Sequence, residues 1–162
     1  MNIDERQMIE RAHDAWQRYV MRLREEDREN LSLTFQRLSL FAYENKARFA
    51  VFVVGSSVLK SEYSDIDLLV CPIGLADAEG FGNLFADFVK SVPEIVNHVG
   101  AKYSLDKQGK TFDNLVWSWA FSPTSEIQFF MKQGSFIAPF EQVMRSEFHN
   151  DYAHPHLLFL PC

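Results

Sequence analysis

The sequence has few cysteines, no excess of basic residues and no long hydrophobic run, and each absence excludes a class of protein. Cys71 and Cys162 are the two cysteines, too few and too far apart for a disulfide framework, so we expect a reducing environment. No apolar stretch approaches the roughly 20 residues of a membrane helix, and no signal peptide is recognisable. We therefore expect a cytoplasmic protein without a membrane partner.

The charge balance also limits the partners. The sequence has 16 basic and 22 acidic residues, which gives a net charge of −6. A long nucleic acid is therefore not expected as a partner, because binding a phosphate backbone needs clustered Lys and Arg. A nucleotide substrate is still compatible with this charge, since a bound divalent cation can supply the missing positive charge.

The 162 residues contain 15 phenylalanines and are 47% hydrophobic, which predicts one compact domain with a single core. Apolar residues recur at helical spacing over residues 1–47, with a charged break predicted at Arg24–Asn30. Residues 1–47 are therefore predicted to form two helices. They make a prefix that packs on the remaining residues, 48–162, and shows no chemistry of its own. Within the remainder, short apolar runs and helical periodicity predict both strands and helices.

Short apolar runs and helical periodicity give the expected elements of residues 48–162. Strands are predicted at 49–54, 66–71, 102–105, 115–121 and 126–131. A helix is predicted at 76–90, with an apolar stripe of Leu84, Phe85, Phe88 and Val89, followed by one further turn at 94–98. Another helix is predicted at 136–148.

The residues that indicate a reaction or a ligand lie where the predicted strand 49–54 ends and where the predicted strand 66–71 begins. Gly55 and Ser56 follow a buried strand and open a predicted helix, so backbone N–H groups and a hydroxyl are available to an anion. Asp65 and Asp67 are two residues apart at the start of the next strand, so their side chains point the same way. Two adjacent carboxylates repel each other, and a divalent cation relieves that repulsion. This arrangement predicts a place to hold a metal ion and a triphosphate.

The segment from Val54 to Val70 resembles the nucleotidyltransferase superfamily, which includes DNA polymerase beta, poly(A) polymerases and the minimal nucleotidyltransferases. The shared pattern is a hydrophobic residue with Gly-Ser, a spacer, and then Asp-hydrophobic-Asp-hydrophobic. Here it is Val54-Gly55-Ser56, eight residues, and Asp65-Ile66-Asp67-Leu68. The run from Ser64 to Val70 is most like the minimal enzymes, and the resemblance covers residues 49–131.

The resemblance implies an α+β fold, with a mixed β-sheet and helices on one face, and a site that binds an NTP with Mg²⁺ (or Mn²⁺). It also implies a third acidic residue on a later strand, beside the acceptor hydroxyl. Glu126 is the candidate, and Asp113 is the weaker alternative. Alternation along 126–131 puts Ile127, Phe129 and Met131 toward the core and leaves Glu126 on the opposite face with Gln128.

Three other features give weaker indications of function. Lys60, in the spacer, is a candidate phosphate contact or a solvated surface lysine. Trp117 and Trp119 share one face of a strand, which indicates core packing, with base stacking as the alternative. The segment His149–His156 contains three histidines, but its spacing fits no structural zinc pattern.

Two functions follow from these residues. The first is a metal-dependent nucleotidyltransferase that moves an NMP from an NTP to a hydroxyl and releases pyrophosphate. Asp65, Asp67 and Glu126 hold the metal, and Gly55, Ser56 and Lys60 contact the nucleotide. The expected acceptor is a small molecule or a protein, and the resemblance implies a helical partner protein or a second copy of the chain as a partner. The alternative is a non-catalytic interaction or nucleotide-sensing module, because Glu126 stands where the family usually has Asp.

Overall fold

The computed structural model describes residues 14, 17–54, 57, 62–73, 78–105 and 111–133. Residues 17–22 are helical and precede the seven elements named next. The two helices are α2 (Glu25–Asn45) and α4 (Ala78–Lys90), and the five strands are β1 (Phe49–Val54), β2 (Ile66–Pro72), β3 (Ile95–Leu105), β4 (Thr111–Ser122) and β5 (Ser125–Gln133). The helix predicted at 136–148 lies outside the described residues.

The five strands form one mixed sheet in the order β1-β2-β5-β4-β3. The pair β2–β5 is parallel, and the pairs β1–β2, β4–β5 and β3–β4 are antiparallel. Strand β5 lies between β2 and β4, so it joins the antiparallel pair β1–β2 to the antiparallel pair β3–β4. The predicted α+β fold with a mixed sheet is confirmed.

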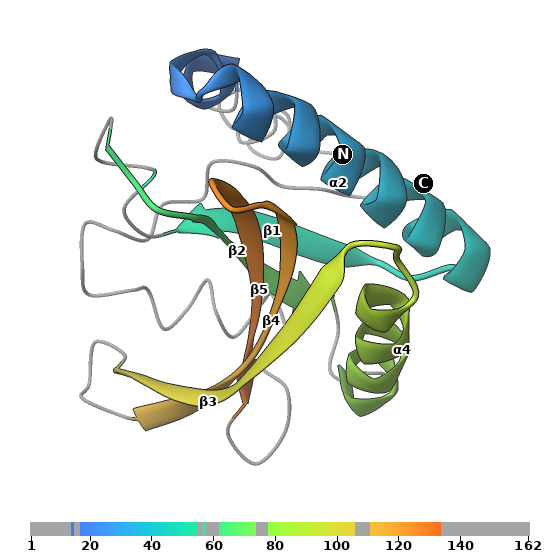
Figure 1. Ribbon diagram of the computed structural model, residues 1–162. Coiled ribbons are helices and arrows are strands. Elements are labelled where there is room, and N and C mark those ends of the chain that lie inside the picture. Colours follow the sequence, from blue (N-terminus) through green and yellow to red (C-terminus); the bar gives the residue numbers. More distant parts are fainter. Residues whose placement is uncertain are drawn as a thin grey trace.

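Helices α2 and α4 cover one face of this sheet, and Figure 1 shows α4 beneath α2 beside the curved strands. A single core joins the buried face of both helices to alternate residues of four strands. Phe85 of α4 is at its centre, with ring contacts to Phe41 of α2 and Phe129 of β5 at centroid distances of 5.8 and 5.6 Å. The division of the chain at residue 47 stays a prediction.

Along β5, Ile127, Phe129 and Met131 belong to the core, as alternation predicted, and Ile66, Leu68 and Val70 do the same on β2. Other positions on the opposite face are buried too, including Phe52 of β1 and Leu69 of β2. Cys71 is also buried, in agreement with its place in an apolar strand. No helix among the described residues is both long and apolar enough to cross a bilayer.

Two predicted boundaries were wrong. Helix α2 begins at Glu25, so the charged stretch is helical after Arg24, and the break is confined to Leu23 and Arg24. Three acidic residues in the first turn, Glu25, Glu26 and Asp27, suit the positive end of the helix dipole. The turn predicted at 94–98 is instead the start of β3.

Candidate active site

Sheet register brings the two predicted halves of the site to one end of the sheet. Val54, the residue before Gly55, is paired with Asp67 across β1 and β2. Gly55 and Ser56 themselves, and Lys60, lie outside the described residues, so their predicted contacts with a nucleotide stay predictions. Asp65 and Asp67 are both partly buried on either side of fully buried Ile66. This alternation places Asp67 on the face opposite the helices, and Asp65 directly precedes the strand.

The parallel pairing of β2 with β5 decides which polar residues adjoin the aspartates. Asp67 is paired with Gln128, and Ile66 is paired with Ile127. Glu126, two residues before Gln128, is also partly buried, and its Oε1 atom accepts a hydrogen bond from Gln128 Nε2 at 3.4 Å. Glu126 therefore lies on the same face as Asp67 but nearer the start of the strand.

Asp113, the alternative third acid, lies at the far end of β4. Its partner on β5 is Gln133, five residues beyond the Gln128 that adjoins Asp67. This places its backbone roughly 16 Å further along the sheet, at about 3.3 Å per residue. The sheet register therefore favours Glu126 over Asp113 as an acid near the aspartates.

The donor set suits a hard divalent cation, because carboxylate and amide oxygens are the ligands of Mg²⁺ and Mn²⁺. The side-chain positions do not complete the predicted three-carboxylate centre. Among the residues that the structure describes, no three acidic, histidine or cysteine side chains lie close enough to hold a metal ion. Asp65, Asp67 and Glu126 are all described, so their predicted role as three ligands of one cation has no support from the side-chain positions and stays a prediction.

A helical segment before α2 contacts the residue that follows the Gly-Ser pair. The Tyr19 hydroxyl and Ser57 Oγ are 2.8 Å apart, and Tyr19 and Ser57 are only 1% and 3% exposed. Burial raises the pKa of Tyr19 far above its usual value, and the charges of Asp27 and Asp67 contribute in the same direction. Tyr19 therefore stays protonated in this buried contact beside the site.

One buried acid near the site was not found from the sequence. Asp27 is 2% exposed, and its Oδ2 atom accepts hydrogen bonds from Arg24 Nε at 2.8 Å and from the Tyr63 hydroxyl at 2.7 Å. Its Oδ1 atom accepts one from Ser125 Oγ at 2.7 Å. Burial, followed by the hydrogen bond to Asp27, raises the pKa of Tyr63. Asp27 stands among several acids in a charged stretch, so no local signal marks it.

Trp117 and Trp119 belong to the core between α4 and the sheet, which confirms core packing over base stacking. They are 4% and 0% exposed. Trp119 donates a hydrogen bond from Nε1 to the Val89 carbonyl oxygen at 2.9 Å, so the end of α4 is fixed to β4. The histidines of residues 149–156 lie outside the described residues.

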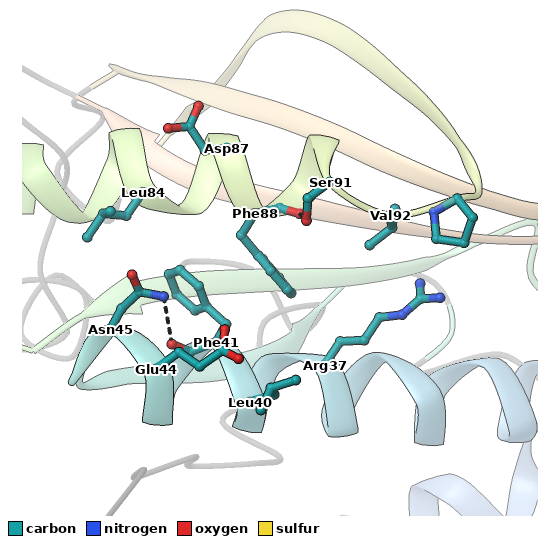
Figure 2. Close-up of a pocket in the computed structure, with 11 residues that line it drawn as sticks. Arg37, Leu40, Phe41, Glu44, Asn45, Leu84, Asp87, Phe88, Ser91 and Val92 are labelled. Carbon is teal, nitrogen blue, oxygen red and sulfur yellow. Dashed lines mark hydrogen bonds between the residues drawn. The ribbon is translucent and has the colours of Figure 1, made fainter.

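A groove of about 480 Å³ lies between α2 and α4, and none of the predicted site residues lines it. Figure 2 shows Phe88 of α4 and Phe41 of α2 pointing toward each other across it, and their rings stack at 4.7 Å. Leu84, predicted to face the core, is 44% exposed at this groove, and Leu40 is 56% exposed. The apolar stripe of α4 is therefore made by Phe81, Phe85 and Val89, with Phe88 partly buried against the same core and Leu84 outside it.

No protein-family model matches this chain, and no curated protein sequence matches it. The structure is similar to one described as the complex of a CCA-adding enzyme with CTP, at 20% sequence identity and a TM-score of 0.34. The similarity covers 68% of this chain and 22% of that chain, so this chain spans about a fifth of that length. The resemblance to nucleotidyltransferases therefore rests on the sequence from Val54 to Val70.

Proposed function

We propose that this chain is a metal-dependent nucleotidyltransferase, which moves an NMP from an NTP to a hydroxyl group of a small molecule or a protein. One observation carries the proposal. The strand that leads into Gly55-Ser56 is paired with the strand that carries the aspartates, with Val54 opposite Asp67. The end of β1, which precedes the candidate phosphate-binding residues, therefore adjoins the strand that carries the carboxylate pair, and this supports transfer from a triphosphate.

Each group has a distinct part in the proposed reaction. The backbone N–H groups near Gly55 and the Ser56 hydroxyl bind the triphosphate, and Lys60 neutralises part of its charge. Asp65 and Asp67 hold Mg²⁺ or Mn²⁺, which when bound offsets the negative charge of the phosphates. Glu126 orients the acceptor hydroxyl and takes its proton. The acceptor oxygen then bonds to the α-phosphorus, the bond to the β-phosphate oxygen breaks, and pyrophosphate leaves.

The test is a thermal-shift series with the four NTPs, with and without Mg²⁺ or Mn²⁺, followed by a pyrophosphate assay. We expect metal-dependent stabilisation, because a ligand that binds only the folded state raises its stability, by about 2.7 kcal/mol at 100 times the Kd. Replacing both aspartates (Asp65→Ala with Asp67→Ala) should abolish the shift and the pyrophosphate release. Asp87→Ala, which removes an exposed acid of α4, is the matched control and should change neither.

One observation favours a second candidate, a non-catalytic module that senses nucleotides or binds a partner. The described acids do not gather as a group of three that could hold a metal ion. In this case NTP binding would persist without pyrophosphate release, and it would not depend on the metal. The same thermal-shift series therefore separates the two candidates.

A further inference from the structure

The hydrogen bonds of Asp27 connect α2 to the starts of the two strands that carry the predicted site acids. Tyr63 is two residues before Asp65, and Ser125 directly precedes Glu126. The first paired residues of β2 and β5, Ile66 and Ile127, follow immediately. One carboxylate thus bonds to both chain segments at the point where their acidic side chains emerge.

Both oxygens of Asp27 are used, which fixes the orientation of its carboxylate. A buried charge is unfavourable unless it is paired and hydrogen-bonded, and here Arg24 supplies the opposite charge. The Arg24 guanidinium also lies over the Tyr63 ring, 4.7 Å from its centroid, and the Arg24 backbone N–H donates to the Tyr63 hydroxyl at 3.1 Å. Tyr63 is therefore held by Arg24 and Asp27 together, on the side of β2.

On the side of β5, the first turns of α2 hold the β4–β5 hairpin at further points. Asn30 Nδ2 donates to Ser125 Oγ at 2.8 Å, and Thr124 Oγ1 donates to Glu26 Oε2 at 2.8 Å. Ser122 Oγ also donates to the Glu26 carboxylate. These bonds join residues at least 95 positions apart, so they fix the hairpin before Glu126 to a remote part of the sequence.

We propose that Asp27 is a positioning residue, which holds the starts of β2 and β5 together and thereby fixes Asp65 relative to Glu126. The inference rests on the proposed function, because positioning has a chemical consequence only where the two acids act at one site. Asp27 acts through Tyr63 and Ser125 and is not itself assigned to the reaction.

The ion pair of Arg37 with Glu94 provides a matched control. It also fixes α2 to the sheet through a carboxylate, with two hydrogen bonds of 2.8 Å to the segment before β3. No predicted site residue adjoins Glu94 in the sequence. Glu94→Gln therefore weakens the packing of α2 without altering the starts of β2 or β5.

The experiment compares wild type, Asp27→Asn and Glu94→Gln by amide hydrogen exchange and by Mn²⁺ binding measured with electron paramagnetic resonance. In Asp27→Asn we expect faster exchange at both 62–67 and 125–128, and Mn²⁺ affinity lower by about 10-fold, as for other residues that orient metal ligands. Glu94→Gln should leave both segments and the Mn²⁺ affinity unchanged. Tyr63→Phe should speed amide exchange at 62–67 alone, and Ser125→Ala should speed it at 125–128 alone. Both variants keep the Arg24–Asp27 ion pair, so they test the positioning role even where Asp27→Asn fails to fold.

Unchanged exchange at the two segments in Asp27→Asn, or an equal loss of Mn²⁺ affinity in Glu94→Gln, would overturn the positioning role. Tyr63→Phe and Ser125→Ala variants that bind Mn²⁺ as wild type does would also overturn it. A wild-type protein that binds neither Mn²⁺ nor any NTP overturns the proposed function instead. In that case the exchange rates still decide whether Asp27 joins the two strand starts.

Discussion

Asp67 of β2 lies beside Gln128 of β5 in the parallel register, and Glu126 lies two residues earlier on the same strand. The residue that adjoins Asp67 is thus a neutral amide. A carboxylate in this position would add like-charge repulsion in the absence of a cation, whereas the amide adds none. The Gln128 amide group also donates to Glu126, so these two polar residues of β5 form a pair on this face.

Replacement of Glu126 tests its part in the proposed transfer. In Glu126→Gln we expect pyrophosphate release to fall by about 10²–10⁴-fold, because the proton acceptor for the hydroxyl is lost. The thermal shift with NTP and Mn²⁺ should shrink but remain, since one predicted metal ligand is lost while Asp65 and Asp67 are intact. Asp87→Ala, which removes an exposed acid of α4 outside the site, serves as the control. Equal activity of Glu126→Gln and wild type would remove Glu126 from the reaction.

Removal of the Tyr19 hydroxyl should both destabilise the fold and weaken nucleotide binding. Tyr19→Phe leaves Ser57 Oγ buried without the partner that it has at 2.8 Å, which costs about 1–3 kcal/mol. Ser57 directly follows Gly55-Ser56, so the loop loses an anchor. Urea denaturation measures the first effect and NTP titration the second. Loss of stability with unchanged NTP affinity would confine Tyr19 to a structural role.

Tyr19 also predicts loss of stability at alkaline pH. The pKa of the buried phenol is raised above its ordinary value of 10.0, so its contribution to stability is complete below pH 10. Above pH 10 the unfolded chain loses its proton first, and stability should fall as pH rises. Denaturation midpoints of wild type and Tyr19→Phe between pH 8 and 11 measure this difference. Parallel curves for the two proteins would contradict the prediction.

Glu94 predicts an opposite dependence at acid pH. The hydrogen bonds from Arg37 lower the pKa of Glu94 below its ordinary value of 4.5. Its contribution to stability is therefore present above pH 4.5 and is lost as pH falls through the lower pKa of the folded state. The difference in the free energy of unfolding between wild type and Glu94→Gln should be constant near pH 7 and shrink at acid pH. A difference that stays constant down to pH 3 would be inconsistent with the lowered pKa.

Trp119 should be among the residues most important for stability. It is fully buried, contacts Phe129 edge-on at 4.7 Å, and donates to the Val89 carbonyl oxygen. Trp119→Ala should cost about 3–5 kcal/mol of the free energy of unfolding, as for other large aromatic deletions. Chemical denaturation measures this loss, and Tyr43→Ala, at an exposed position of α2, is the control. A cost below about 1 kcal/mol would show that the site collapses around the missing ring.

Elements with strong local patterns were predicted well, and those that depend on distant partners were not. The strand predicted at 49–54 matches both ends of β1 (Phe49–Val54), because six apolar residues in succession suit a buried strand. Strand β3 was recognised only at its C-terminal end. It lies at the edge of the sheet, follows Pro93 and has a register shift between His98 and Gly100, so its pattern is irregular and its strand conformation depends on pairing with β4.

The sequence by itself determined the strands that carry the candidate site and the face on which Asp65, Asp67 and Glu126 lie, because side-chain alternation is a local property of a strand. Only the tertiary structure decided that β5 lies beside β2, that Gln128 adjoins Asp67, and that Asp27 is the buried acid of its turn. The physical reason is that strand neighbours and burial are set by contacts between remote segments. Glu25, Glu26 and Asp27 are chemically similar in sequence, and only the positions of Tyr63 and Ser125 distinguish Asp27.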